Sequence, residues 1–124
     1  MAKRILIVED EPDVRVSSRN ILERYGYIVQ TAANGAQALS IVCQYPPVDL
    51  IILDIQMPEM NGYVFINEIK KREGCSSIPI IVVTAYPELQ PIFILKGVTT
   101  CLLKPVNTEE FMEKIKQYLC EEKA

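Results

Sequence analysis

Five short apolar runs alternate along the chain with longer segments whose apolar residues recur at helical spacing. Each apolar run is short, rich in β-branched residues and bounded by turn-forming residues, which predicts a strand. The predicted strands are residues 4–8, 27–32, 50–53, 80–83 and 101–103. Helices are predicted at residues 12–25, 36–45, 63–72, 90–96 and 108–122. The chain is therefore expected to repeat one strand and one helix five times.

Strands this apolar are typical of a parallel sheet that is buried on both faces, and the intervening helices supply right-handed crossovers. We predict an α/β fold of the flavodoxin-like, doubly wound type, a (βα)5 sandwich whose five-stranded parallel sheet has the order 2-1-3-4-5. At 124 residues the chain is long enough for one such core and too short for two. A single domain over residues 1–124 is expected.

The fourth helix is predicted to be short or irregular. Pro91 lacks an N–H and its ring clashes one turn back, so no helix can run through it from Pro87. The helix is therefore expected to begin near Pro91. All four residues from 92 to 95 are apolar, which is more than one buried stripe requires, so at least one of them is expected to face outward.

Composition excludes several classes of function. Thirteen basic and sixteen acidic residues give a net charge of -3, which argues against direct binding of nucleic acid. No apolar run is long enough to cross a bilayer, and the first residues are not a signal peptide, so we predict a cytoplasmic protein without membrane insertion. The chain has four scattered cysteines and no histidine, which removes the common zinc sites and the commonest general base. Chemistry must rest on carboxylates, hydroxyls and lysine.

Polar side chains follow four of the five predicted strands. Glu9 and Asp10 follow the first, Asp54 the third, Thr84 the fourth and Lys104 the fifth. The carboxyl ends of parallel strands meet at one edge of a sheet, where doubly wound folds bind their ligands. If the first and third strands are neighbours, with a spacing of about 4.8 Å, Asp10 and Asp54 reach a common ligand. Carboxylates so close repel one another, so they either share protons or hold a cation. Mg²⁺ prefers such oxygen ligands.

A metal ion, an ammonium group and a hydroxyl around one carboxylate form a site suited to phosphoryl transfer. The Mg²⁺ ion and Lys104 would neutralise the phosphoryl oxygens, and Thr84 would offer a hydroxyl. Asp54 would then be the nucleophile that becomes an aspartyl phosphate. This role explains why the apolar strand of residues 50–53 is followed by an acid, because the strand holds Asp54 at the site.

Four segments carry a resemblance to a known family: ILIVEDEPDVR, LIILDIQMPEMNGYVF, IPIIVVTAY and CLLKP. In this order and at this spacing, they make the whole chain resemble the receiver domain of two-component response regulators. The resemblance implies a domain that accepts a phosphoryl group from a sensor histidine kinase or a phosphotransfer protein. It also implies that phosphorylation switches a surface for a downstream protein target or for a covalent output domain.

The resemblance assigns roles to individual residues. It implies that Asp54 is phosphorylated and, with Asp10, binds Mg²⁺ directly. Gln56 would bind the same ion through its main-chain carbonyl, and Glu9 would act through water. Glu9 is a mild departure, because the family more often has Asp at this position.

The resemblance also assigns the phosphoryl oxygens to the side chains of Thr84 and Lys104, and implies a cis peptide bond between Lys104 and Pro105. Cys101 and Tyr86 lie nearby in the sequence. Cys101 stands where receivers usually carry an aromatic residue. Cysteine is too small to alter a large area of surface by moving between two positions. Tyr86 has two interpretations: a ring over the phosphoryl group that slows hydrolysis, or an exposed loop aromatic.

The departures at Cys101 and Pro91 suggest that output uses residues 90–96. We hypothesise that this segment, with residues 101–103 and 108–122, forms a partner surface or a homodimer face. Phosphorylation is expected to change how well ordered residues 90–96 are. In the alternative, the four apolar residues of this segment all pack inward and output uses another face.

Three other functions would use a similar fold. A phosphatase of the haloacid dehalogenase type would carry its nucleophile after the first strand and a second acid two residues later, a place that Gln56 occupies here relative to Asp54. A flavin carrier would need to hold a phosphate in the loop of residues 9–11, where three acids would repel it. A receiver fold that acts as a phosphorylation-independent interaction module remains open.

Overall fold

The computed structural model describes residues 2–42, 44, 47–55, 60–72 and 74–119. No helix within these ranges is both long and apolar enough to cross a membrane. The elements, in chain order, are β1 (Arg4–Val8), α1 (Pro12–Arg24), β2 (Ile28–Ala32), α2 (Gly35–Val42), β3 (Leu50–Ile55), α3 (Met60–Lys71), β4 (Ile80–Thr84), the 3-10 turn η1 (Pro87–Leu89), α4 (Gln90–Leu95), β5 (Thr100–Leu103) and α5 (Thr108–Tyr118).

The strands form one parallel sheet in the order β2-β1-β3-β4-β5, which confirms the predicted topology. Val8 of β1 pairs with Leu53 of β3, and Thr84 of β4 pairs with Leu103 of β5. Asp54 of β3 pairs with Val83 of β4. This register places the carboxyl ends of β1, β3, β4 and β5 at one edge of the sheet.

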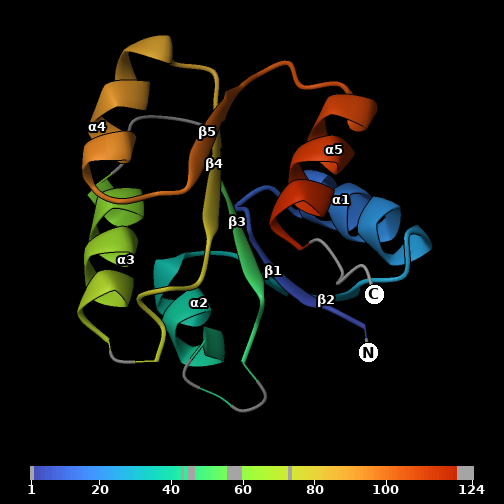
Figure 1. Cartoon of the computed structure of the whole chain (residues 1–124), viewed down its shortest axis with the longest axis horizontal. Helices are drawn as coiled ribbons and strands as arrows, with labels where there is room; N and C mark the ends of the chain where they lie inside the picture. The colour runs from blue at the N-terminus through green and yellow to red at the C-terminus, as the bar shows by residue number, and fades with distance from the viewer. Residues whose placement is uncertain (1, 43, 45–46, 56–59, 73, 120–124) are drawn as a thin grey trace.

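Helices cover both faces of the sheet (Figure 1): α1 and α5 lie on one side, and α2, α3 and α4 lie on the other. Each side has its own apolar cluster, because successive residues of a strand point to opposite faces. Leu6 joins Phe65 and Phe93 on the α2–α4 side, whereas Ile5 joins Leu22 on the α1–α5 side. The sheet is therefore buried on both faces, as its apolar strands predict.

Two helices differ from the prediction at their ends. Helix α3 begins at Met60, before the predicted start at Tyr63. The first turn of a helix has no intrahelical partners for its N–H groups, so Gly62 is tolerated there despite its poor helix propensity. Helix α2 ends at Val42; residues 43 and 45, within the predicted helix, lie outside the described residues, as do residues 120–122 of the predicted last helix.

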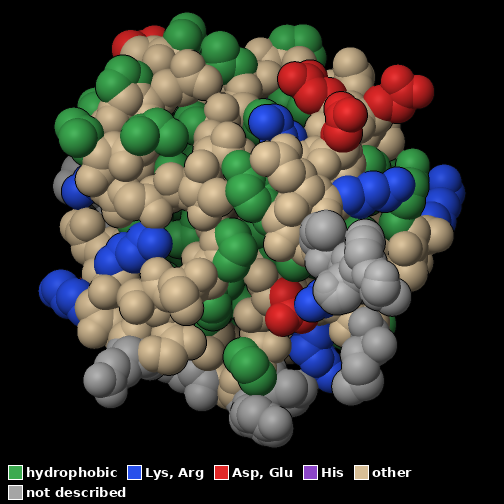
Figure 2. Space-filling view, in the orientation of Figure 1, with side chains coloured by type: hydrophobic (Ala, Val, Ile, Leu, Met, Phe, Trp, Pro, Cys, Tyr) green, Lys and Arg blue, Asp and Glu red, His purple; other side chains and the backbone are tan. Residues whose placement is uncertain are grey.

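Helix α4 is short and begins at Gln90, with Pro91 in its first turn, as predicted. Phe93 is fully buried, but Ile94 is 51% exposed and Leu95 is 87% exposed. The expectation that at least one apolar residue of this segment faces outward is therefore confirmed. Figure 2 shows hydrophobic side chains gathered over α4 at the upper left of the molecule.

Candidate functional site

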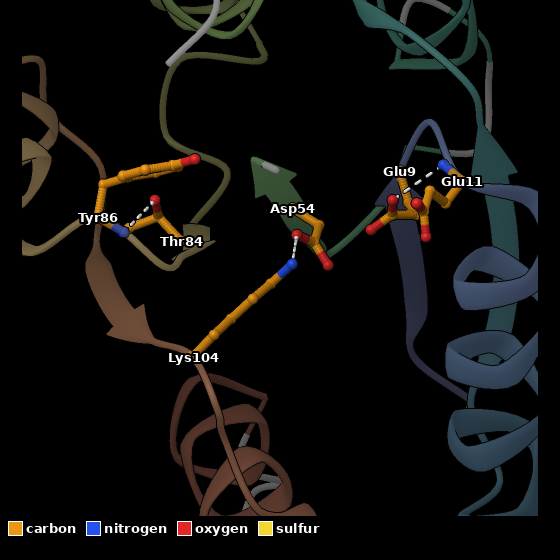
Figure 3. Close-up of polar contacts among 6 residues, drawn as sticks. All are labelled: Glu9, Glu11, Asp54, Thr84, Tyr86 and Lys104. Carbon is orange, nitrogen blue, oxygen red and sulfur yellow. Dashed lines mark hydrogen bonds and ion pairs between the residues drawn. The ribbon is translucent and has the colours of Figure 1, made fainter. Parts of the chain in front are cut away.

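Asp54, Thr84 and Lys104 form what is here named the β3–β5 corner. The Nζ of Lys104 lies 2.7 Å from Oδ1 of Asp54 (Figure 3). Both side chains are largely buried, with 27% of Lys104 and 14% of Asp54 exposed, so the pair is shielded from most of the screening that weakens surface ion pairs. The prediction that Lys104 reaches across the sheet edge to Asp54 is confirmed.

The main chain places Lys104 for this contact. Leu103 pairs with Thr84, and the N–H of Lys104 donates to the carbonyl of Thr84 at 2.8 Å. Lys104 therefore leaves the sheet level with the end of β4 and sends its long side chain back toward β3. The Lys104–Pro105 peptide bond is cis, as the resemblance implies.

The hydroxyl of Thr84 lies in a buried position at the end of β4. It accepts a hydrogen bond of 3.1 Å from the main-chain N–H of Tyr86. The ring of Tyr86 is partly buried and packs against the apolar cluster on the α2–α4 side. The interpretation of Tyr86 as a merely exposed loop aromatic is therefore wrong, because the core covers part of its ring.

Glu9 and Asp10 form the β1 corner at the end of β1. Glu9 is only 1% exposed, and its Oε2 accepts a hydrogen bond of 2.9 Å from the N–H of Glu11. Its carbonyl accepts a further bond of 2.8 Å from Nη1 of Arg15. Because Glu11 is the N-cap of α1, the helix dipole also favours the carboxylate of Glu9. Asp10, in contrast, is exposed.

Figure 3 shows Glu9 turned toward Glu11, while Asp54 faces Lys104. Among the described residues, no three His, Cys, Asp or Glu side chains gather closely enough to hold a metal ion. Gln56 lies outside the described residues. The structure thus pairs Asp54 with Lys104, whereas Glu9 is bonded to the main chain of Glu11.

The donor set at this edge nevertheless suits Mg²⁺. Glu9 and Asp54 each directly follow one member of the pair Val8–Leu53 on adjacent strands, so their main chains are neighbours. The side chains they offer, with that of Asp10, are all carboxylates, the hard oxygen ligands that Mg²⁺ prefers. Mg²⁺ also keeps several waters, which allows a site with few protein ligands.

A cavity of about 610 Å³ opens beside the ion pair. Asp54 and Lys104 line it together with apolar side chains, which include Val14 and Ile21 of α1 and Phe111 of α5. The carboxylate of Asp54 is therefore buried enough to be oriented and still borders open space. The arrangement can present the carboxylate of Asp54 to a small reactant as an oriented nucleophile, with the ammonium group of Lys104 beside it.

Cys101 lies in β5 on the α4 side of the sheet, packed against the same apolar cluster as Tyr86. Burial raises the pKa of the Cys101 thiol, and a hydrogen bond with Gln90 opposes this shift only in part. The thiol is therefore neutral at physiological pH and serves as a small packing residue. The Nε2 of Gln90 also donates to the carbonyl of Cys101 at 3.2 Å.

Sequence reasoning missed the groups that hold the site residues. The N–H of Glu11 and the N–H of Tyr86 are main-chain donors, which have no signature in the sequence. Arg15 was missed as the partner of the Glu9 carbonyl; its place one turn into α1, facing the strand end, is the signal that could have indicated it.

Comparison with known proteins supports one family. The model of the response regulator receiver domain matches residues 5–116. Sporulation initiation phosphotransferase F of Bacillus subtilis is 36% identical over 121 residues, which cover 96% of this chain and 95% of that protein. Sensor histidine kinase TmoS of Ectopseudomonas mendocina is 37% identical, but the match covers 90% of this chain and only 12% of TmoS.

A solved structure agrees with the sequence matches. The response regulator TrrA of Thermotoga maritima, in complex with Mg²⁺ and beryllofluoride, superposes with a TM-score of 0.80 at 35% identity. The similarity covers 94% of this chain and 98% of TrrA. The strand order, the match over residues 5–116 and these relatives agree: the chain belongs to the response regulator receiver domain family, the phospho-accepting domains of two-component signalling systems.

Proposed function

We propose that Asp54 is the residue that accepts the phosphoryl group. The observation that carries this proposal is the 2.7 Å ion pair between Asp54 and Lys104 at the edge of the sheet. A carboxylate oxygen of Asp54 attacks the phosphorus of a phosphohistidine on the partner kinase. An O–P bond forms, the N–P bond breaks, and its electron pair stays on the leaving imidazole, which takes up a proton.

The side chains around Asp54 then stabilise the transferred group. Lys104, already beside the carboxylate, donates to a phosphoryl oxygen, and the hydroxyl of Thr84 donates to another. When bound, Mg²⁺ would neutralise charge on the phosphoryl oxygens. Its ligands would be Asp10, Asp54 and the main-chain carbonyl of Gln56, with Glu9 acting through water.

The chain is proposed to be a phosphoacceptor and not an enzyme that turns over phosphomonoesters. One chain then takes up at most one phosphoryl group, and it assists its own phosphorylation and dephosphorylation. A phosphatase would instead release phosphate many times per chain when given an excess of substrate. This difference in stoichiometry separates the two functions in a single assay.

The test compares intact masses after treatment with acetyl phosphate and Mg²⁺. Wild type and the control Asp13→Asn, which alters an exposed acid of α1, should each gain one phosphoryl group. Asp54→Asn should gain none. A full adduct on Asp54→Asn would show that another residue is the acceptor. No adduct on wild type, with or without Mg²⁺, would favour the phosphorylation-independent interaction module.

We further propose the partners and setting that follow from this role. The phosphoryl donor is a sensor histidine kinase or a phosphotransfer protein in the cytoplasm, and residues 1–124 act as a single receiver domain. The output is a downstream protein or a covalent output domain, without direct contact to nucleic acid. TmoS, of which this chain matches only a part, supports a covalent arrangement. Sporulation initiation phosphotransferase F, which this chain matches over nearly the whole length, supports a separate receiver that acts on another protein.

The exposed apolar residues of α4 and β5 are proposed to form the output surface. Leu95 of α4 is the most exposed of them, and Leu103 of β5 is also exposed. A homodimer through α4, β5 and α5 would cover this surface. Sedimentation of wild type and Leu95→Ser, with and without beryllofluoride, tests the dimer: association only in treated wild type supports it, and a monomer in all four samples contradicts it.

A further inference from the structure

The hydroxyl of Thr84 is already engaged, and its partner is not Asp54. Its oxygen accepts the N–H of Tyr86 at 3.1 Å, and Figure 3 shows it turned toward Tyr86 and away from Asp54. Binding a phosphoryl group on Asp54 requires this hydroxyl to turn toward β3. In that turn the oxygen would move away from the N–H of Tyr86, so the hydroxyl would exchange this hydrogen bond for one to the phosphoryl group.

Losing that bond affects more than Thr84. The hydrogen bond from the N–H of Tyr86 to the Thr84 hydroxyl is partly buried, and a partly buried N–H that loses its acceptor is destabilised unless it finds another. The main chain at Tyr86 therefore gains free energy by moving to find another partner. A turn of one side chain in β4 becomes a displacement of the segment that follows.

Tyr86 is the junction between Thr84 and α4. It is the N-cap of η1, and its carbonyl accepts a hydrogen bond of 3.1 Å from the N–H of Leu89. Its ring packs against the apolar cluster that contains Leu89 and Phe93. A shift of Tyr86 therefore reaches α4 through both the main chain and the core.

Cys101 of β5 cannot transmit the shift to α4 in the way that Tyr86 can. Cys101 packs against the same cluster, but its side chain is too small to displace a helix. A direct hydrogen bond also joins β5 to α4, from Nε2 of Gln90 to the carbonyl of Cys101. Gln90 is the first residue of α4. The 3-10 turn η1 is therefore held at its start by the bond between Tyr86 and Thr84, and at its end by the bond between Gln90 and Cys101.

We propose that Tyr86 is the positioning residue that couples phosphorylation of Asp54 to α4, in place of an aromatic residue in β5. Phosphorylation draws the Thr84 hydroxyl toward β3, releases the N–H of Tyr86, and shifts η1 and α4 with their exposed Ile94 and Leu95. This inference rests on the proposed role of Asp54 as the phosphoryl acceptor.

The test follows amide hydrogen exchange in ¹⁵N-labelled protein treated with beryllofluoride and Mg²⁺, while ¹⁹F NMR reports whether the adduct forms. The amide of Tyr86 should exchange at least about tenfold faster in the adduct, since it loses a hydrogen bond. The change should extend over residues 89–95. No adduct on wild type contradicts the proposed function itself. An adduct that leaves the Tyr86 amide unchanged overturns the coupling.

Variants separate the hydroxyl from the ring. Thr84→Val keeps the shape of the side chain but lacks the acceptor, so its Tyr86 amide should exchange fast before any treatment, whereas the control Thr84→Ser should match wild type. Tyr86→Ala and Tyr86→Phe should both form the adduct, but only Tyr86→Phe should keep the response of residues 89–95. A protected Tyr86 amide in folded Thr84→Val, or an equal response of α4 in Tyr86→Ala and Tyr86→Phe, overturns the proposal.

Discussion

The β1 corner and the β3–β5 corner each hold a buried carboxylate at the same edge of the sheet, by different means. Asp54 is compensated by the side chain of Lys104 at 2.7 Å. Glu9 is compensated by a main-chain N–H, that of Glu11, at 2.9 Å and by the start of α1. A lysine side chain is flexible and can change partner, whereas a helix N-terminus cannot.

This difference assigns different work to the two corners. The charge beside Asp54 can move to a phosphoryl group once the group is transferred, so the β3–β5 corner is suited to chemistry. The partners of Glu9 belong to the main chain and to the start of α1, so the β1 corner is suited to holding α1 and the exposed Asp10 at the edge. Substitutions in the two corners should therefore give different kinds of defect.

The largest effect is expected at Lys104. Lys104→Met removes the ammonium group beside Asp54, and losing one such stabilising group typically slows a reaction about 10²–10³-fold. The rate of phosphorylation by acetyl phosphate should fall by about this factor. Lys116→Met, which removes an exposed lysine of α5, is the control and should keep the wild-type rate. Rates within a factor of about three for both variants would contradict a role of Lys104 in the chemistry.

The β1 corner should respond in stability. Glu9→Ala leaves the N–H of Glu11 without its acceptor, which should lower the free energy of unfolding by about 1–3 kcal/mol. Glu9→Gln keeps an acceptor oxygen in nearly the same place, so its loss should be smaller. Urea unfolding of the three proteins measures the difference. Equal stability of Glu9→Ala and wild type would mean that the bond to Glu11 does not hold this corner.

A smaller effect is expected on Mg²⁺ affinity. Asp10→Asn removes one of the few protein ligands of the proposed ion. Loss of a residue that only supports a ligand already lowers metal affinity about tenfold or more, so affinity should fall by at least this factor. Glu11→Gln is the matched control, because it removes the same charge one residue away from an exposed side chain. Titration with Mg²⁺, followed by NMR, compares them. An equal loss in both variants would indicate only a general effect of charge.

The smallest effect is expected at Arg15. Arg15→Met removes the bond from Nη1 to the carbonyl of Glu9, and the free energy of unfolding should fall by about 1 kcal/mol. The rate of phosphorylation should not change, because the β3–β5 corner is untouched. A clear loss of rate without loss of stability would show that the two corners are not separate.

Much of this site follows from the sequence, because apolar runs mark the strands and parallel strands bring their carboxyl ends together. Asp54 and Lys104 meet as that logic predicts. The orientations of Glu9 and Thr84 do not follow, since each side chain turns toward a main-chain N–H. Such donors are placed by the whole fold and not by local preference. The start of α3 at Met60 was missed for another reason, because Gly62 has a poor helix propensity but is tolerated in the first turn.

The most direct test of the central claim locates the phosphoryl group chemically. Wild-type protein is treated with acetyl phosphate and Mg²⁺, reduced with borohydride and digested, and its peptides are sequenced by mass spectrometry. Borohydride reduces an acyl phosphate to an alcohol, so a phosphorylated aspartate becomes homoserine. Homoserine at position 54, at no more than one per chain and absent without the phosphodonor, is the predicted result. Reduction at Asp10 or Glu9, with Asp54 unchanged, would contradict it.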